Sequence, residues 1–233
     1  MDFFNTIGQQ IYDNLIAKDR YMYIINGLGT TLEITFFAVF IGIFIGILIA
    51  MIKVAAANNK RLKFLEVLAN IYLTVIRGTP AVVQLFIMYY IILASSGVDK
   101  VVAAIFAFGI NSGAYVAEII RAGILSVDKG QMEAGRSLGL TYTTTMTKII
   151  FPQALKNIIP ALGNEFVTLL KETSVAGFIG VMDLSKAGDI IRSQTYDAIV
   201  PLLSVALVYL VLVVGLTSLL SMLERRLRKS DIR

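Results

Sequence analysis

Long apolar runs without charge constrain this chain more than any other feature. Residues 34–52 contain no charged side chain and are bounded by Glu33 and Lys53, and residues 198–223 contain none either. A helix that spans the hydrocarbon core of a bilayer needs about 20 mostly apolar residues. Both runs are therefore expected to be transmembrane helices, since a helix satisfies its own backbone polar groups in lipid.

Three further runs have the length for a span. A second run extends over residues 62–98 and is interrupted at the sequence RGTP, with no charged residue over 78–98. Residues 101–125 form the third run, and residues 158–182 form the fourth of five predicted spans. The composition also indicates a membrane protein, because 57% of the 233 residues are hydrophobic and 16% are charged. Soluble domains average about 45–50% apolar and about 25% charged residues.

Lys and Arg residues set the expected orientation, because they are enriched in short cytoplasmic loops. They gather after the first span, in the 126–152 segment with its flanks, and in the tail. The predicted fold class is therefore an all-α integral membrane protein with five transmembrane helices, its N-terminus outside and its C-terminus cytoplasmic. The expected parts are an extracytoplasmic or interfacial segment over 1–23, a membrane domain over 24–225 with a cytoplasmic loop at 126–152, and a basic tail over 226–233.

The first 23 residues do not resemble a secretory signal, because charges are scattered through them and no apolar core follows a basic start. Apolar residues at helical spacing are consistent with a short interfacial helix, and a loose polar segment is an equal alternative. The chain has no Cys and no His, so we expect no catalytic residue, no metal site and no disulfide. The formal net charge of +5 lies in clusters that flank apolar runs, which is not typical of nucleic-acid binding.

The sequence GQMEAGRSLGL at residues 130–140 breaks the apolar pattern. Asp128 is a candidate N-cap for a short helix through Leu138, and Gly139 suits the left-handed position after a helix. A second short helix is predicted over 142–149, ending before Pro152. Small residues in this loop leave a face that another surface can approach. An ordinary structured loop is the alternative interpretation.

The same loop resembles the EAA motif of ABC importer permease subunits. The family pattern is E-A-A, three residues, G, nine residues, I, one residue, L, P. Here Glu133, Ala134 and Gly135 are followed by Gly139 and then by Ile149 with Phe151-Pro152, so Gly and Phe replace one Ala and the Leu. The stretches RGTP, AYVAEIIRAGI and LKETS are similar to the polar amino acid uptake subfamily of the histidine, arginine and glutamine permease type. The resemblance covers roughly residues 25–225.

The resemblance implies a type I importer permease in a bacterial cytoplasmic membrane. Glu133, Ala134, Gly135 and Gly139 would then belong to a coupling helix that docks on a separate ABC ATPase subunit. No G-x-x-x-x-G-K-[ST] phosphate loop occurs in the sequence, so ATP is expected on that other subunit and no cofactor on this one. The implied partners are a second copy or a homologous permease, an extracytoplasmic amino acid-binding protein, lipid and the amino acid.

Charged residues inside the predicted spans are candidates for function or for structural pairing. Arg77 lies at the RGTP break and is expected to satisfy freed carbonyls or to pair with an acid. Glu118 and Arg121 are three residues apart and can pair on one helix face. Lys171 and Glu172 begin four consecutive polar residues, which predicts a broken helix beside a polar cavity.

Glu165 is different, because no Lys or Arg lies three or four residues away on its helix. A carboxylate in a membrane needs a proton, a partner from another helix or a cationic ligand. The resemblance implies that the substrate is a polar amino acid, and a cationic ligand at Glu165 would make basic amino acids the candidates. The residues predicted to bind it are Glu165, Asn164, Thr168, Tyr115, Thr173 and Ser174.

Three function classes compete at this stage. The favoured one is the permease subunit of an ATP-driven amino acid importer, which is not itself an enzyme. A stand-alone secondary transporter or channel for a small polar solute would also use broken helices and buried charges, but it would not explain a cytoplasmic loop with EAA spacing. A membrane enzyme is disfavoured by the lack of His, Cys and clustered carboxylates.

Overall fold

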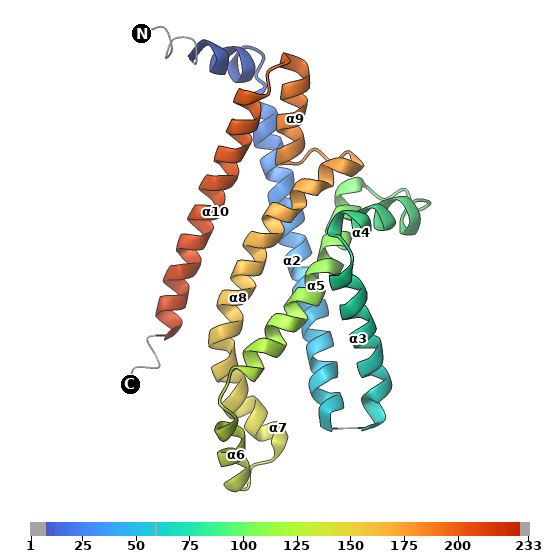
Figure 1. Cartoon of the computed structure of the whole chain (residues 1–233), viewed down its shortest axis with the longest axis vertical. Helices are drawn as coiled ribbons and strands as arrows, with labels where there is room; N and C mark the ends of the chain where they lie inside the picture. The colour runs from blue at the N-terminus through green and yellow to red at the C-terminus, as the bar shows by residue number, and fades with distance from the viewer. Residues whose placement is uncertain (1–7, 59, 229–233) are drawn as a thin grey trace. The chain divides into compact units, whose positions relative to one another are not determined.

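The computed structural model describes residues 8–58 and 60–228, and every regular element within them is a helix. Figure 1 shows long helices joined by short connections and by a few short helical segments. In chain order the elements are η1 (Tyr12–Ile16), α2 (Tyr21–Asn58), η2 (Lys60–Leu62), α3 (Lys63–Gly78), α4 (Ala81–Ile87), η3 (Met88–Ile92), α5 (Lys100–Leu125), α6 (Lys129–Ser137), α7 (Tyr142–Thr145), η4 (Met146–Ile150), α8 (Phe151–Glu172), η5 (Thr173–Ile179), α9 (Leu184–Thr195) and α10 (Ile199–Arg228).

Among the described residues, three helices are long and apolar enough to cross a membrane. They are Tyr21–Ala56 of α2, Lys100–Leu125 of α5 and Ile199–Leu227 of α10, so three of the predicted spans are helices of the required length. The first is much longer than the predicted run over 34–52 and includes Glu33. A charge near the end of an apolar run does not stop a helix, because Glu is a good helix former.

The RGTP sequence breaks the second span as predicted. The helix α3 ends at Gly78, Pro80 precedes α4, and the pair α3 and α4–η3 is bent by 109°. Proline has no N–H to continue a helical ladder and biases the residue before it to extended backbone, and Thr79 is extended at φ −121° and ψ 146°. Taken as one broken span, this pair raises the number of candidate spans to four.

The fourth predicted span is shifted along the chain. The helix α8 runs over Phe151–Glu172 instead of 158–182, and the short helix predicted to end before Pro152 continues through the π-helix η4 into α8. Pro152 closely follows this π-helical turn, so its missing N–H falls where the regular i to i−4 hydrogen-bond ladder is already interrupted. The predicted interruption at Lys171–Ser174 is present, because α8 ends at Glu172 and the 3-10 helix η5 follows, with Gly180 at φ +78° after its last residue. These four residues do not line the polar cavity described below, so the cavity that was predicted beside the break is not borne out.

The helix α8 is long enough for a span, with 22 residues, but its composition is too polar for it to count as a candidate span. It carries Lys156, Glu165, Lys171 and Glu172. The count of five spans therefore depends on α8 and remains a prediction.

The described residues form two compact units, and α2, α5, α8 and α10 contribute to both. The first unit contains residues 8–38, 80–108 and 168–215. Its core joins α2, α9 and α10 through Ile24, Leu184, Ile191 and Val205. Gly27 is needed there, since a Cβ would lie 2.6 Å from the carbonyl oxygen of Asp183.

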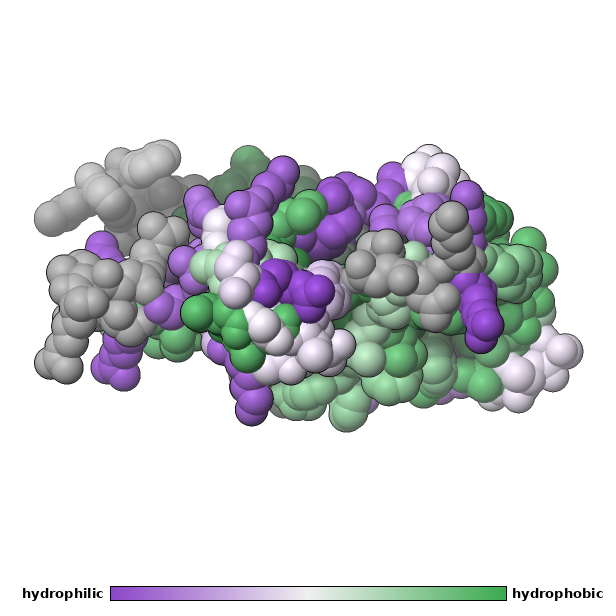
Figure 2. Space-filling view, turned by 90° about the horizontal axis from the view of Figure 1, so that it is seen from below, coloured by the Kyte–Doolittle hydropathy of each residue, from purple (hydrophilic) through white to green (hydrophobic). Residues whose placement is uncertain are grey.

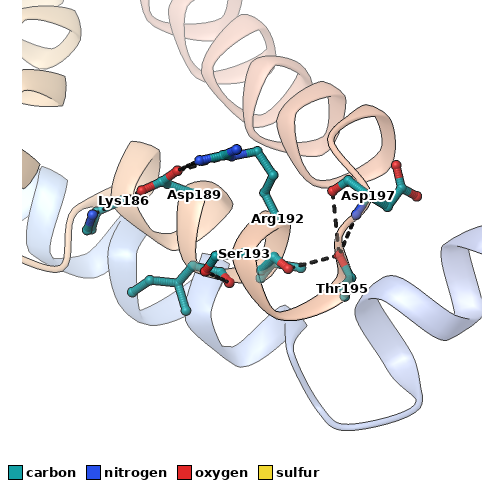
Figure 3. Close-up of polar contacts among 8 residues, drawn as sticks. Lys186, Asp189, Arg192, Ser193, Thr195 and Asp197 are labelled. Atoms are coloured by element: carbon teal, nitrogen blue, oxygen red, sulfur yellow. Dashed lines mark hydrogen bonds and ion pairs between the residues drawn. The ribbon is translucent and has the colours of Figure 1, made fainter.

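The helix α9 was not predicted within the segment 183–197. Asp183 caps its N-terminus by accepting from the backbone N–H groups of Ser185 and Lys186 at 3.1 and 3.0 Å. On its exposed side Asp189 pairs with both Lys186 and Arg192, and Thr195 bonds to the backbone of Asp197 (Figure 3). An Asp N-cap followed by i, i+3 ion pairs is a helix signal that was available in the sequence.

Residues 8–16 are helical, as the interfacial-helix prediction required. The Asn14 side-chain amide donates to Asp197 at 2.8 Å, and Arg20 donates to the Asp13 carbonyl and to Gln194 at 2.8 and 3.2 Å. These bonds attach the segment to the end of α9 within the first unit. The interfacial-helix prediction also used apolar residues within 1–7, and these lie outside the described residues.

The second unit contains residues 39–79, 109–167 and 216–228, apart from residue 59. The helices α2 and α5 approach closely there, because a Cβ on Gly46 would lie 2.4 Å from a Val116 methyl group and one on Gly42 would lie 2.8 Å from the Ser112 hydroxyl. Gly42 and Gly46 form a small-xxx-small pattern, which is typical of helices that pack closely in membranes. This packing holds the residues that line the cavity described next.

Candidate functional site

A polar cavity of about 680 Å³ opens in the second unit between α2, α3 and α5. Its volume falls in the range of about 300–1,000 Å³ that small-molecule sites have. It carries three cations and one carboxylate, together with an amide, a hydroxyl and an aromatic ring. The lining residues are Lys53, Asn70, Leu73, Thr74, Arg77, Gly78, Tyr115, Glu118 and Arg121.

Glu118 is the centre of the charge network in this cavity. Arg121, one turn along α5, donates from Nε to both carboxylate oxygens at 3.0 and 3.1 Å and also through Nη2. Arg77, at the end of α3, reaches the same carboxylate at 3.9 Å. Both predicted pairings are therefore confirmed, and Glu118 connects the bent end of α3 to α5.

Tyr115 lies one turn before Glu118 on α5. The Arg77 guanidinium carbon is 5.7 Å from the centroid of its ring, which is within the range of a cation–π contact. The cavity thus offers guanidinium groups, a carboxylate and an aromatic face, and these can bind a ligand that carries both an anion and a cation.

The predicted substrate-binding residues are divided between the two units. Tyr115 lines the polar cavity, whereas Asn164 and Glu165 belong to the second unit and are not among its lining residues. Glu165 accepts a hydrogen bond from the Ser112 hydroxyl of α5 at 2.8 Å. The interpretation of a partner on another helix is thus supported, although the Ser112 hydroxyl brings no positive charge.

The other predicted substrate residues, Thr168, Thr173 and Ser174, belong to the first unit. Thr173 is fully buried and donates to the Leu170 carbonyl at 2.8 Å, so its hydroxyl stabilises the turn where α8 ends. The side chain of Lys171 is exposed and that of Glu172 is partly buried. In this structure the LKETS stretch ends a helix, which fits its predicted architectural role.

The loop with the EAA spacing folds as two short helices. Asp128 caps α6 by accepting from the N–H of Gly130, and Gly139 has φ +85°, so both parts of this prediction are confirmed. Gly135 is buried, and a Cβ there would lie 2.6 Å from the Thr145 methyl group of α7. The surface that approaches Gly135 therefore belongs to the same loop, and this glycine packs the two helices together.

The outer side of α6 presents a mixed surface. Glu133 and Ala134 are exposed, and the side chain of Leu138 is 81% exposed. Figure 2, which views the molecule from the end where α6 and α7 lie in Figure 1, shows hydrophilic residues between apolar patches.

Several residues of these sites were not singled out from the sequence. Asn70 and Thr74 lie one turn apart on α3, and Ser112 is a polar residue in the middle of a predicted span, so a helical projection could have found them. Lys53 was noted only as the end of an apolar run. The exposure of Leu138 could not be predicted from the sequence, because an apolar residue in a short amphipathic helix is expected to be buried.

The chain belongs to the family of binding-protein-dependent transport system inner membrane components, whose model matches residues 42–229. The predicted resemblance to ABC importer permeases is therefore confirmed. A putative glutamine transport system permease protein of Rickettsia typhi is 39% identical over 210 residues, which cover 89% of this chain and 94% of that protein. The arginine transport system permease protein ArtQ of Bacillus subtilis is 39% identical over 211 residues, 90% of this chain and 94% of its own length.

Solved structures agree with these relatives. An amino acid ABC transporter solved with histidines has a chain that is 45% identical, covers 91% of this chain and 97% of its own, and superposes with a TM-score of 0.82. A chain of the MetNI methionine ABC transporter is 23% identical with a TM-score of 0.72 over 91% of this chain and 98% of its own, and it shows the shared fold alone.

Proposed function

We propose that this chain is the membrane permease subunit of an ATP-driven importer of polar amino acids. It pairs with a second permease, identical or homologous, to form the translocation path. A separate ATPase subunit binds ATP, and an extracytoplasmic binding protein delivers the substrate. The family match and the amino acid permeases among its relatives support this assignment.

The knob formed by α6 and α7 is the observation that carries the proposal. It is held by an N-cap, a left-handed glycine and the packing of Gly135 against Thr145, and it leaves Glu133, Ala134 and Leu138 exposed. A rigid knob with exposed charged and apolar groups suits docking in a groove of a partner. We assign the 126–152 loop to coupling with the ATPase.

Copurification separates this function from the stand-alone transporter. The chain is expressed with and without a candidate ATPase, and the permease is purified in mild detergent. The importer requires a stable complex with the ATPase. Solute uptake by the permease alone in vesicles without ATP would favour the transporter or channel instead.

The proposed topology has five spans, with α8 as the fourth and the broken α3–α4 pair as the second. The N-terminus and the segment 183–197 then lie outside, and the loop 126–152 is cytoplasmic. Because the chain has no natural cysteine, single cysteines at Ser96, Ser137 and Ser193 can be labelled with an impermeant maleimide in intact cells. We expect labelling at Ser96 and Ser193 only, and labelling at Ser137 without permeabilisation would contradict the topology.

We further propose that Glu165 contacts the cationic side chain of a basic amino acid during transport. The Ser112 hydroxyl orients the carboxylate without neutralising it. Glu165→Gln keeps the shape and removes the charge, so it should abolish stimulation of ATP hydrolysis by arginine or lysine and leave the basal rate. Ser112→Ala is the matched control, because it removes the hydrogen bond and keeps the charge. Equal stimulation of the wild type and Glu165→Gln by arginine would rule out the contact.

A further inference from the structure

An apolar groove lies beside the polar cavity, where α2 and α5 end and α7–η4 packs against them. It consists of a cavity of about 550 Å³ and a second one of about 320 Å³. Both are lined by Ala50, Val54, Ile124, Tyr142 and Met146, so they are continuous. We call this space the α2–α5 groove. Its size and apolar lining are typical of a site for a small apolar ligand.

Two cations border the α2–α5 groove. Lys53 and Arg121 line its smaller cavity, and both also line the polar cavity. Within the described part of the chain, the ammonium group of Lys53 makes no hydrogen bond or ion pair. The Arg121 side chain is 46% exposed despite its pairing with Glu118. An anion placed between these two groups would meet positive charge on both sides.

The groove is open toward the apolar flank of the molecule. Met51 lines the larger cavity and Leu125 the smaller one, and each side chain is 63% exposed. Farther along α2, Phe44 is 66% exposed. Exposed apolar surface of this kind faces acyl chains in a membrane protein, so a lipid tail can enter the groove from the side without crossing polar groups.

The cations also lie at a suitable depth. Lys53 is five residues before the last residue of α2, and Arg121 is four before the last residue of α5. At 1.5 Å per residue both are within roughly 8 Å of the helix ends. Long basic side chains at this position extend toward lipid headgroups while their stems stay among apolar groups. This holds for whichever membrane surface these helix ends face.

We propose that the α2–α5 groove binds an anionic phospholipid. One acyl chain occupies the apolar part, and the phosphate lies between Lys53 and Arg121. An amino acid does not fit the apolar lining, and a second copy of this chain would have to bring an acidic group to the two cations. Basic pockets at the ends of membrane helices recognise anionic headgroups by the same complementarity.

Lipid binding would also affect the polar cavity. A phosphate at Lys53 and Arg121 competes with Glu118 for Arg121 and lowers the excess of positive charge in the cavity. Anionic lipid would therefore regulate transport, and this consequence, unlike the binding itself, rests on the proposed function.

The test is native mass spectrometry of the permease purified in detergent with its associated subunits. It is titrated with phosphatidylglycerol and with phosphatidylcholine of the same acyl chains. We expect tighter binding of phosphatidylglycerol. Lys53→Gln should weaken it by roughly five-fold, since one basic group near anionic lipid contributes about 1 kcal/mol and 1.4 kcal/mol is ten-fold. The matched control is Lys63→Gln, which removes an exposed cation at the start of α3 that does not line the groove.

A second variant keeps the cations and fills the apolar part. Val54→Trp should weaken the binding of both lipids. Equal binding of the two lipids by the wild type, an equal effect of Lys53→Gln and Lys63→Gln, or unchanged lipid binding by Val54→Trp would each overturn the proposal. A changed oligomeric state of Val54→Trp with unchanged lipid binding would assign the groove to a second copy. Since lipid binding is measured without transport, these outcomes are independent of the importer assignment.

Discussion

The substitution Gly139→Val separates the shape of the coupling loop from the fold of the membrane helices. Gly139 has φ +85°, and no atom outside its neighbours lies within 4 Å of the position that a Cβ would occupy. The substitution therefore introduces backbone strain without a clash. An L-residue in the left-handed region costs about 1–2 kcal/mol, and a β-branched side chain is among the least tolerant there. This is small against the roughly 5–15 kcal/mol that stabilises a folded protein.

The chain relieves this strain by changing the turn after α6, which moves the exposed groups of the knob. If docking requires the native turn, the variant must restore this turn on binding, which costs the same strain energy. The affinity for the ATPase should therefore fall by roughly 5- to 30-fold. The assay is copurification with the ATPase followed by a binding titration in detergent. Gly139→Asn is the matched control, because Asn tolerates the left-handed region. Normal ATPase binding by the Val variant, or an equal loss in both variants, would refute the reasoning.

Two further predictions concern stability. Gly46→Ala should lower the thermal unfolding temperature in detergent, because its Cβ would lie 2.4 Å from a Val116 methyl group and overpacking costs about 1–3 kcal/mol. Gly29→Ala on the same helix is the control, since its Cβ would meet no atom within 4 Å and the variant should be neutral or stabilising. An equal loss of stability in both variants would contradict the close packing at Gly46. Burial raises the pKa of Asp183 from 3.8 to about 6, against the opposing hydrogen bonds from the Lys186 and Ser185 backbone. The stability that this shift contributes is fully present below pH 4 and is lost as the pH rises through 6. Asp183→Asn keeps a helix-capping side chain, so its stability relative to the wild type should rise by up to about 3 kcal/mol as the pH is raised from about 4 to about 7 in unfolding scans. Parallel pH profiles of the two proteins would contradict this.

Local signals in the sequence predicted local structure well. Asp128 and Gly139 fix where α6 begins and ends, and Pro80 fixes the bend after α3, because caps, left-handed glycines and prolines act on their own backbone. The pairing of Glu118 with Arg121 follows from helical spacing alone. In each case the residues that determine the structure are within one turn of each other.

Features that depend on distant residues could not be predicted. The second partner of Glu118 is Arg77 on another helix, and the role of Gly135 depends on Thr145 across the loop. The polar cavity is lined by residues from α2, α3 and α5, so no single segment of the sequence reveals it. The start of α8 was misplaced because a π-helical turn carries the chain through the apparent stop at Pro152.

Ligand-stimulated ATP hydrolysis shows whether this chain works as the permease subunit of an ATP-driven amino acid importer. This chain is reconstituted in vesicles with its ATPase and binding protein, and the hydrolysis rate is measured across a panel of amino acids. We expect the hydrolysis rate to rise with one or a few polar amino acids, and we expect Gly139→Val to weaken this stimulation. A permease that does not associate with any ATPase, or a complex that no amino acid stimulates, would contradict this assignment.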